Sequence, residues 1–266
     1  MKQFSMYKTI KVEADKRGVT TVTMTRPEVH NAFNAEMIAE LTSAFDALDK
    51  NSDTRVIVLQ SQGESFSAGA DINWMKSMVK ATQAENQEDS LKLAALMRAI
   101  NFCSKAVIAR VQGLALGGGV GLIACCDIAI ANEESKFGLT EAKLGLVPAV
   151  ISPYVIDAIG SRHSRRFFQT AEIFNAEKAY EIGLISEFVP HEELDEQVEK
   201  QISFLLKTGP SAKTISKKLV HSVSARTIPQ QKKIDQYTTQ VIAAVRVSEE
   251  GQLGLKAFLD KKKPKW

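Results

Sequence analysis

The sequence predicts an α/β protein in which a core of strands and helices, residues 1–190, is followed by a helical region, residues 191–266. Short segments rich in β-branched residues alternate with segments in which apolar residues recur every three or four positions. Beyond residue 150 the strand-like segments thin out and amphipathic helical patterns take their place. With 44% hydrophobic and 24% charged residues, the 266-residue chain has the composition of an ordinary globular protein with one large domain and a smaller appendage.

Charge and cysteine content exclude several classes of protein. The net charge of +3 is too small to indicate a nucleic-acid-binding protein, because such domains concentrate basic residues on one face. Three cysteines cannot form a disulfide framework, which favours the reducing cytoplasm. The N-terminal segment "MKQFSMYKTIKVEADKRG" lacks the apolar core of a signal peptide, so no export is expected.

The first 70 residues predict two paired strands, a helix and a third strand. "TIKVEA" and "GVTTVTMT" are typical of strands that pair around a turn at 15–18. Asn34 is placed to cap a helix. The apolar residues of this helix repeat on one face, at Met37, Leu41, Phe45 and Leu48. "RVIVLQS" then predicts a buried strand, and the small residues of "QGESFSAGADINWM" predict a tight loop.

The middle and the end of the chain are predicted to be increasingly helical. Residues 76–90 are polar and fit either a mobile surface segment or the exposed start of a helix. Leu93, Met97 and Ile100 share one face of a helix that precedes the strand "AVIARV". "DIAIA" and "KFGLT" are further strands, and residues 192–207, 211–224 and 229–259 have amphipathic helical patterns.

The segment "GLALGGGVGLIACCDIAIA", residues 113–131, has five glycines within nine residues. Only 16 uncharged residues separate Arg110 from Asp127, whereas a membrane-spanning helix needs about 20. The glycines partly match a dinucleotide-binding loop, but "LIACC" is too short for the crossover helix of that fold, which takes roughly 10 residues or more. The segment therefore predicts a short helix between two strands.

Two glycine-rich loops are candidates for binding a negatively charged oxygen. "FSAGADI" and "LALGGGVGL" each follow a buried strand, and loops of this kind expose backbone N–H groups. Two such loops that face each other can hold an oxyanion between them. The sequence therefore favours an enzyme that stabilises developing negative charge.

The joint occurrence of "SAGADI", "GLALGGG", "ACCDIAIA" and "KFGLTEAKLGLVP" resembles the enoyl-CoA hydratase/isomerase (crotonase) superfamily. The resemblance extends from "RPEVHNAFN" to "AFLDKKKPKW". It implies a spiral of ββα units and C-terminal helices that build a homotrimer, or a hexamer as a dimer of trimers. It also implies an acyl-CoA thioester as substrate, with coenzyme A as part of the substrate, no separate cofactor, no metal and no membrane partner.

The resemblance implies roles for individual residues. The N–H groups of Ala70 and Gly118 would form the oxyanion hole, and Glu141 would be the general acid and base. A purely structural reading of Glu141 is an acidic residue in the first turn of a helix. The remaining family positions would bind substrate: Ala68 through its carbonyl to the adenine, Gly69, Asp71, Ile72, Leu116, Gly117, Gly121, Pro148, and Phe258, Lys261 and Lys262 in the tail. For Lys261 a solvated tail is an equal alternative.

Two departures from the family pattern bear on the substrate. Family hydratases carry a first glutamate where this chain has Gly121, and "VPAVISPYV" replaces a glycine-rich segment. These features resemble bacterial methylglutaconyl-CoA and γ-carboxygeranoyl-CoA hydratases of leucine and acyclic-terpene breakdown. Because glycine removes a side chain and a negative charge, we expect room near Gly121 for an acyl chain that is branched at C3 and carboxylated.

Alternatives to hydration remain open at this point. A double-bond isomerase needs a single base, which Glu141 could supply. RNA binding through Arg162, Arg165 and Arg166 is a third possibility, and it would weaken steeply with salt. The four histidines lack the spacing of metal ligands, and Cys125 and Cys126 are predicted to be buried apolar residues. Trp74 and Met75 either line the acyl pocket or pack in the core.

Overall fold

The computed structural model describes residues 7–264 and residue 266, and the predicted α/β class is confirmed. The first six residues lie outside the described residues. They belong to the N-terminal segment for which no signal peptide is expected. A six-stranded sheet has the order β1-β2-β3-β4-β6-β9, and a three-stranded sheet has the order β5-β7-β8. The strands are β1 Ile10–Ala14, β2 Val19–Met24, β3 Val56–Ser61, β4 Ala106–Val111, β5 Leu114–Leu116, β6 Ile128–Asn132, β7 Lys136–Gly138, β8 Ile173–Asn175 and β9 Glu187–Val189.

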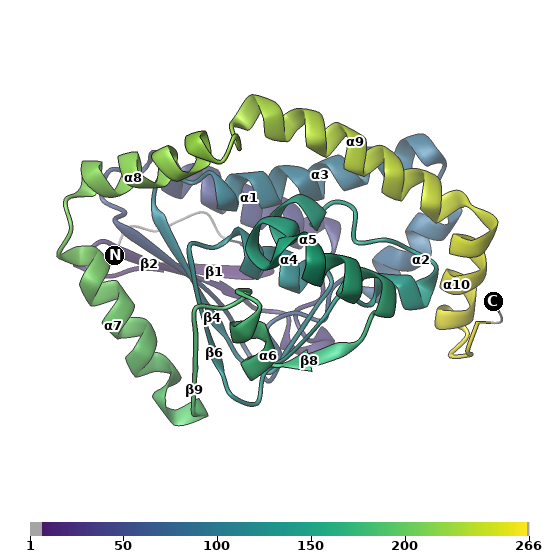
Figure 1. The fold of residues 1–266 in the computed structure, drawn as a ribbon, viewed down its shortest axis with the longest axis horizontal. Coiled ribbons are helices and arrows are strands. Elements are labelled where there is room, and N and C mark those ends of the chain that lie inside the picture. Colours follow the sequence, from purple (N-terminus) through teal and green to yellow (C-terminus); the bar gives the residue numbers. More distant parts are fainter. Residues whose placement is uncertain (1–6, 265) are drawn as a thin grey trace.

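Helices cover both sheets and make up the C-terminal part of the chain (Figure 1). The α-helices are α1 Ala35–Lys50, α2 Ile72–Lys80, α3 Gln83–Asn101, α4 Gly118–Cys125, α5 Ser152–Thr170, α6 Ala176–Glu181, α7 Leu194–Leu206, α8 Pro210–Val223, α9 Ile228–Val247 and α10 Glu249–Leu259. Short 3₁₀ helices are η1 Pro27–Val29, η2 Thr140–Leu144 and η3 His191–Glu193. No helix within residues 7–264 is long and apolar enough to cross a membrane.

The two sheets are connected by a repeated strand–strand–helix pattern. β4 joins the large sheet, β5 joins the small sheet, and α4 follows. β6 and β7 repeat the pattern before η2 and α5. Within the large sheet only β1 and β2 are antiparallel, and the other pairs are parallel. This pattern agrees with the predicted spiral of ββα units.

Local signals in the sequence account for several element boundaries. The predicted pairing of β1 with β2 is present, and Asp15 accepts hydrogen bonds at the turn from the N–H groups of Arg17 and Val19. The Asn34 side chain accepts from the N–H of Met37 and caps α1, as predicted. The polar segment 76–90 comprises the end of α2 and the start of α3, which are separated by Ala81 and by Thr82, the capping-box residue of α3. The alternative of a helix start is therefore confirmed, and the mobility of the segment stays a prediction.

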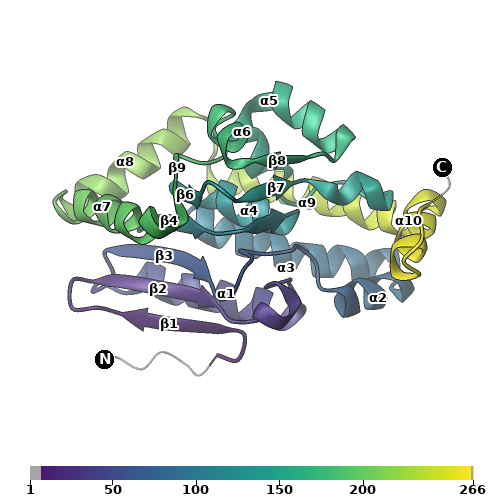
Figure 2. The same cartoon turned by 90° about the horizontal axis from the view of Figure 1, so that it is seen from below.

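The C-terminal region packs on the core through α7, α9 and α10, and α8 contacts it through hydrogen bonds from Thr214 to the Ser104 carbonyl and between His221 and the Asn101 carbonyl. α7 buries Leu194, Val198 and Ile202 in one cluster with strand residues of the large sheet. α9 runs along α3, and α10 lies beside α2 (Figures 1 and 2). The single helix predicted for residues 229–259 is wrong, since Ser248 ends α9 and caps α10 with its side chain. The division at residue 190 stays a prediction.

Candidate active site

Three chain segments come together at one edge of the small sheet. β5 and β7 are parallel, with Leu116 opposite Gly138, so the residues after both strands emerge side by side. The N–H of Gly117 donates to the Gly138 carbonyl at 2.9 Å. Ser67 bridges to Ala115, which brings the loop after β3 to the same edge. The two glycine-rich loops of the sequence and the segment containing Glu141 are therefore neighbours.

The geometry of the two loops leaves two backbone donors available. No hydrogen bond from the N–H of Ala70 or of Gly118 is found within the part of the chain that the structure describes, and both residues line one cavity. The residue before each of these donors is a glycine whose backbone conformation disfavours other residues, because Gly69 and Gly117 have φ values of 87° and 48°. Gly118 has no room for a side chain either, since a Cβ there would lie 2.4 Å from Phe33 Cε2. The arrangement fits the predicted oxyanion hole.

The cavity beside these loops has a volume of about 380 Å³ and is mainly apolar. Its walls come from the two loops, from η2 and the segment after it, and from α2, α3, α9 and α10. The apolar residues that line it include Phe33, Trp74, Met75, Met78, Leu93, Leu116, Leu144, Leu146, Val147, Val150, Ile151, Ile242, Leu255 and Phe258. A larger cavity of about 570 Å³ between α1 and α3 shares Trp74 with it but contains neither glycine-rich loop. We therefore place the site in the smaller cavity.

Glu141 is the only carboxylate among the described residues that line this cavity. It lies in η2 beside Gly117, where a Cβ would be only 2.9 Å from Glu141 Oε1. Its Oε2 is buried and has no hydrogen-bond partner among the described residues. Burial raises the pKa of Glu141 to about 7, although a hydrogen bond from its own N–H opposes the rise. A carboxyl with this pKa can both take and return a proton near neutral pH.

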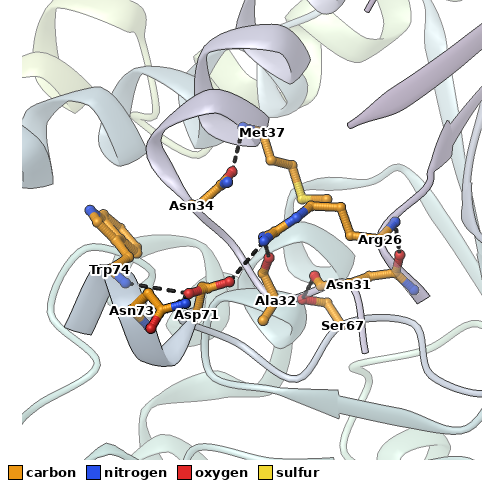
Figure 3. A network of polar contacts seen from close by, with 9 residues as sticks. All are labelled: Arg26, Asn31, Ala32, Asn34, Met37, Ser67, Asp71, Asn73 and Trp74. Carbon is orange, nitrogen blue, oxygen red and sulfur yellow. Dashed lines mark hydrogen bonds and ion pairs between the residues drawn. The ribbon is translucent and has the colours of Figure 1, made fainter. Parts of the chain in front are cut away.

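An ion pair that the sequence analysis did not identify fixes the first loop. Arg26 donates to Asp71 Oδ2 at 2.8 Å and to the Ala32 carbonyl at 2.6 Å (Figure 3). Asp71 also accepts from the N–H groups of Asn73 and Trp74 and so caps α2. Burial opposes ionisation of Asp71, but hydrogen bonds from Arg26 and from these N–H groups lower its pKa. Because Asp71 directly follows Ala70, the Arg26–Asp71 ion pair also fixes the position of Ala70.

The structure divides the predicted site residues into two groups. Those that line the cavity are Ala68, Gly69, Ala70, Leu116, Gly117, Gly118, Glu141, Pro148 and Phe258. Those that do not line it are Asp71, Ile72, Gly121 and Lys261. Ile72 is exposed on the first turn of α2, and of the two predicted tail lysines Lys262 lines the cavity and Lys261 does not. Contact of Asp71, Ile72 and Lys261 with coenzyme A stays a prediction.

The expectation of open space at Gly121 is wrong. A Cβ at Gly121 would lie 2.3 Å from Ile151 Cγ2 and 3.3 Å from Met97 Cε. The space that a larger side chain would need is therefore already filled by Ile151, which belongs to the segment "VPAVISPYV". The two departures from the family pattern, Gly121 and the segment "VPAVISPYV", therefore pack against each other, with Ile151 against Gly121.

The sequence analysis did not identify two charged residues of the cavity, Lys143 and Arg246, of which Arg246 is the buried one. It lies in α9, one turn after the cavity residue Ile242, on a helix face that is otherwise apolar at this point. The sequence signal that could have identified it is its spacing of four residues from Ile242, which puts both side chains on the same face of a helix. Trp74 and Met75 line the cavity, which was one of the two roles considered for them.

The other chemical candidates are not supported by their surroundings. Burial raises the pKa of Cys103 to about 12 and that of Cys125 well above its ordinary value, so neither is a thiolate near neutral pH. No group of three or more potential metal ligands occurs among residues 7–264 and 266. Arg166, considered for RNA binding, is paired with Glu172 at 2.8 Å.

Comparisons with known proteins agree with this geometry. Residues 14–266 match the family model described as enoyl-CoA hydratase/isomerase. The crotonyl-CoA hydratase of Syntrophomonas wolfei is 30% identical over 97% of this chain and 97% of its own length. The solved structure of an enoyl-CoA hydratase from Shewanella pealeana is 40% identical with a TM-score of 0.80, covering 97% of this chain and 96% of that one. A second, from Mycobacterium avium, is 30% identical with a TM-score of 0.85, covering 97% and 99%.

The match therefore extends over nearly the whole chain, in sequence and in fold. The predicted crotonase-like fold is confirmed by these structures, with C-terminal helices present as expected. The chain belongs to the enoyl-CoA hydratase/isomerase family and is an enzyme of the hydratase type.

Proposed function

We propose that this enzyme adds water across the C2–C3 double bond of an enoyl-CoA thioester, with Glu141 as its single acid and base. The observation that carries the proposal is the position of Glu141. Its carboxylate lies beside the glycine loop that presents the N–H of Gly118, in an apolar cavity that holds no other carboxylate of the described chain. An acid–base group next to an oxyanion hole is the arrangement that this addition requires.

The proposed reaction proceeds through an enolate. The ionised Glu141 takes a proton from water while the water oxygen forms a bond to C3. The electron pair of the double bond moves toward the thioester oxygen, where the N–H groups of Ala70 and Gly118 stabilise the negative charge. Protonated Glu141 then gives its proton to C2, which yields a 3-hydroxyacyl-CoA and restores the carboxylate. One water molecule is consumed, and no other reactant is needed.

The coenzyme A portion is proposed to enter between the first loop and α10. The carbonyl of Ala68 is proposed to accept from the adenine amino group, which is supported by the position of Ala68 and Phe258 in the wall of the same cavity. Lys143 and Lys262 add positive charge to the cavity and are available to coenzyme A phosphates. Lys261 stays a candidate for the same role on the surface.

The acyl chain is proposed to be branched at C3 and carboxylated, as in the methylglutaconyl-CoA or γ-carboxygeranoyl-CoA type. Resemblance of the segment around Gly121 and Ile151 supports this class. Gly121 itself does not support it, because Ile151 fills the space beside this glycine. A positively charged residue that binds the carboxylate of the acyl chain must therefore lie elsewhere in the cavity.

Isomerisation of an enoyl-CoA is the second candidate, favoured by the same single carboxylate. A double-bond isomerase needs one base to move a proton between C2 and C4, and Glu141 could do so. The two reactions are distinguished by mass spectrometry after incubation with 2-enoyl and 3-enoyl thioesters. Hydration adds one water to the product mass, whereas isomerisation leaves the mass unchanged. Conversion of 3-enoyl substrates without any gain of water would overturn the proposal of hydration.

A homotrimer, or a hexamer of two trimers, is proposed as the assembled form. Its support is the outer face of α8, where four large apolar side chains are each more than 60% exposed: Ile215, Leu219, Val220 and Val223. Such a patch is typical of a protein interface. Free cysteines at positions 103, 125 and 126 support the cytoplasm as its compartment.

A further inference from the structure

Three buried polar atoms that lack a hydrogen-bond partner belong to residues of the cavity. They are Oε2 of Glu141, Nε1 of Trp74 and Nε of Arg246. Buried polar groups are nearly always hydrogen-bonded, so an unpaired one requires an explanation. Glu141 has its explanation in the proposed reaction. Trp74 and Arg246 are hydrogen-bond donors and have no part in that reaction.

Arg246 is the more demanding of the two because it carries a charge. Its side chain is only 8% exposed, and no carboxylate within the described part of the chain lies within 4.0 Å of it. Burial lowers the pKa of Arg246 to about 10, so the guanidinium is still protonated at neutral pH. The Asp89 charge opposes this lowering of the pKa, but no carboxylate of the described residues makes ion-pair contact with the guanidinium. A buried cation without such a contact is costly and is rare in folded proteins.

The hydrogen bonds of Arg246 use one part of the guanidinium only. Nη1 donates to Ser90 Oγ at 3.1 Å and approaches Asn86 Oδ1 at 3.5 Å, and both of these partners lie on α3. Nε is unpaired, and no hydrogen bond from Nη2 occurs within residues 7–264. The edge formed by Nε and Nη2 is one that binds a carboxylate through two parallel hydrogen bonds. The side chain is thus held by α3 with a carboxylate-binding edge left over.

Arg246 stands among apolar residues of the cavity wall. It follows Ile242 by one turn of α9, and its partner Asn86 also binds the carbonyl of Met78, a cavity residue of α2. The cavity wall near Arg246 is apolar and consists of Met75, Met78, Leu93 and Ile242. An uncharged acyl chain would pack against this wall without a need for the guanidinium. Lys143 and Lys262 are more exposed and stand on η2 and after α10.

We propose that Arg246 is a specificity-determining residue that binds a carboxylate carried by the acyl chain of the substrate. The inference rests on the proposed function, because it assumes an enoyl-CoA in this cavity. It assigns the recognition of a carboxylated acyl chain to α9 and α3 and not to the region of Gly121. A neutral acyl chain of the same length leaves the guanidinium without a partner, so it binds less well.

The test compares matched pairs of 2-enoyl-CoA thioesters that differ only by a carboxylate. One pair is 3-methylglutaconyl-CoA and 3-methylcrotonyl-CoA, and further pairs extend the chain before the terminal carboxylate or methyl group. For at least one length we expect the native enzyme to prefer the carboxylated member. Arg246→Met should lower kcat/KM for that member by about 10- to 100-fold, as expected for a lost charged hydrogen bond. The neutral member should change by less than about 3-fold on the same reasoning.

Two further variants separate recognition from other roles. Lys262→Met removes a positive charge from the same cavity and should lower kcat/KM equally for both members of a pair, because it acts on coenzyme A. Arg246→Lys keeps the charge but loses the fork, and its intermediate preference for the carboxylated member provides a readout if the methionine variant does not fold.

Equal effects of Arg246→Met on both members at every chain length would overturn the inference in favour of a structural or phosphate-binding role. Absence of any preference in the native enzyme would overturn it as well. Failure of the native enzyme to hydrate any thioester of the panel would instead refute the proposed function, so the two failures are distinguishable.

Discussion

Replacing Glu141 by glutamine should make the protein more stable at alkaline pH while removing its activity. The folded protein raises the pKa of this carboxyl from an ordinary 4.5 to about 7, mainly through burial. One pKa unit corresponds to about 1.4 kcal/mol, so the shift costs the folded state about 3 kcal/mol once the group is ionised. This is an upper value, because water that enters the cavity reduces the effect of burial.

The direction of the effect with pH follows from the order of ionisation. Below pH 4.5 the carboxyl is protonated in both states and contributes nothing to the difference. Between 4.5 and about 7 the unfolded chain ionises first, so the free energy of unfolding falls as pH rises. Above about 7 the full destabilisation is present. Glutamine does not ionise, so Glu141→Gln should lack this part of the pH dependence.

Paired unfolding experiments measure this difference directly. Urea midpoints of the native protein and Glu141→Gln should diverge between pH 5 and pH 8 until the variant is more stable by up to about 3 kcal/mol. For a chain of this size the thermal midpoint should rise by roughly 5 to 10 °C. Over the same range kcat/KM of the variant should be lower by at least about 100-fold, as for a lost acid–base group.

Parallel stability profiles of the two proteins would refute the reasoning. They would mean that the Glu141 carboxyl has an ordinary pKa in the folded protein, whatever the activity of the variant. A variant that gains stability and keeps its activity would confirm the burial but would remove Glu141 from the mechanism.

Three other predictions concern activity and packing. In the native enzyme kcat/KM for hydration should rise with pH through about 7 and then level off, because Glu141 must be ionised to accept a proton; a flat profile between about pH 6 and 8 would contradict this. Gly121→Glu should lower the free energy of unfolding, measured by urea titration, by roughly 1 to 3 kcal/mol through overpacking against Ile151, and the added Ile151→Ala should restore it; a single variant as stable as the native protein would contradict this. Asp71→Asn should leave the largely buried Arg26 without its carboxylate partner, which should lower the stability by about 3 kcal/mol and kcat by at least roughly tenfold. If calorimetry and initial rates of the variant match those of the native protein, the ion pair does not hold the first loop in place.

The sequence predicted well what depends on local pattern. The cap at Asn34, the turn at 15–18 and the short helix after the glycines follow from residue types at fixed spacing, and the structure contains all three. The two glycine loops and Glu141 could be identified because resemblance extends over long, specific motifs. Their meeting at one edge needed the parallel pairing of β5 with β7, which no local pattern specifies.

The failures concern contacts between distant segments. Gly121 was read as an open position because a missing side chain suggests space, whereas Ile151, thirty residues later, occupies that space. Arg246 was overlooked because its setting depends on α3 and α2, which are far away in sequence. The pairing of Asp71 with Arg26 was missed because it could not be inferred from either residue alone, and the predicted contact of Asp71 with substrate stays a prediction.

The close packing of α10 against η2 has a consequence for the order in which the site can form during folding. A Cβ on Gly254 would lie 2.2 Å from the Leu144 carbonyl, so the last helix presses directly on the short helix that carries Glu141. Leu255 and Phe258 of the same helix complete the cavity wall. The dry surroundings of Glu141 thus depend on a helix, α10, that is far from η2 in the sequence. A folding intermediate in which every strand has formed but α10 has not yet docked would expose this carboxyl to water, and its pKa would lie closer to the ordinary value.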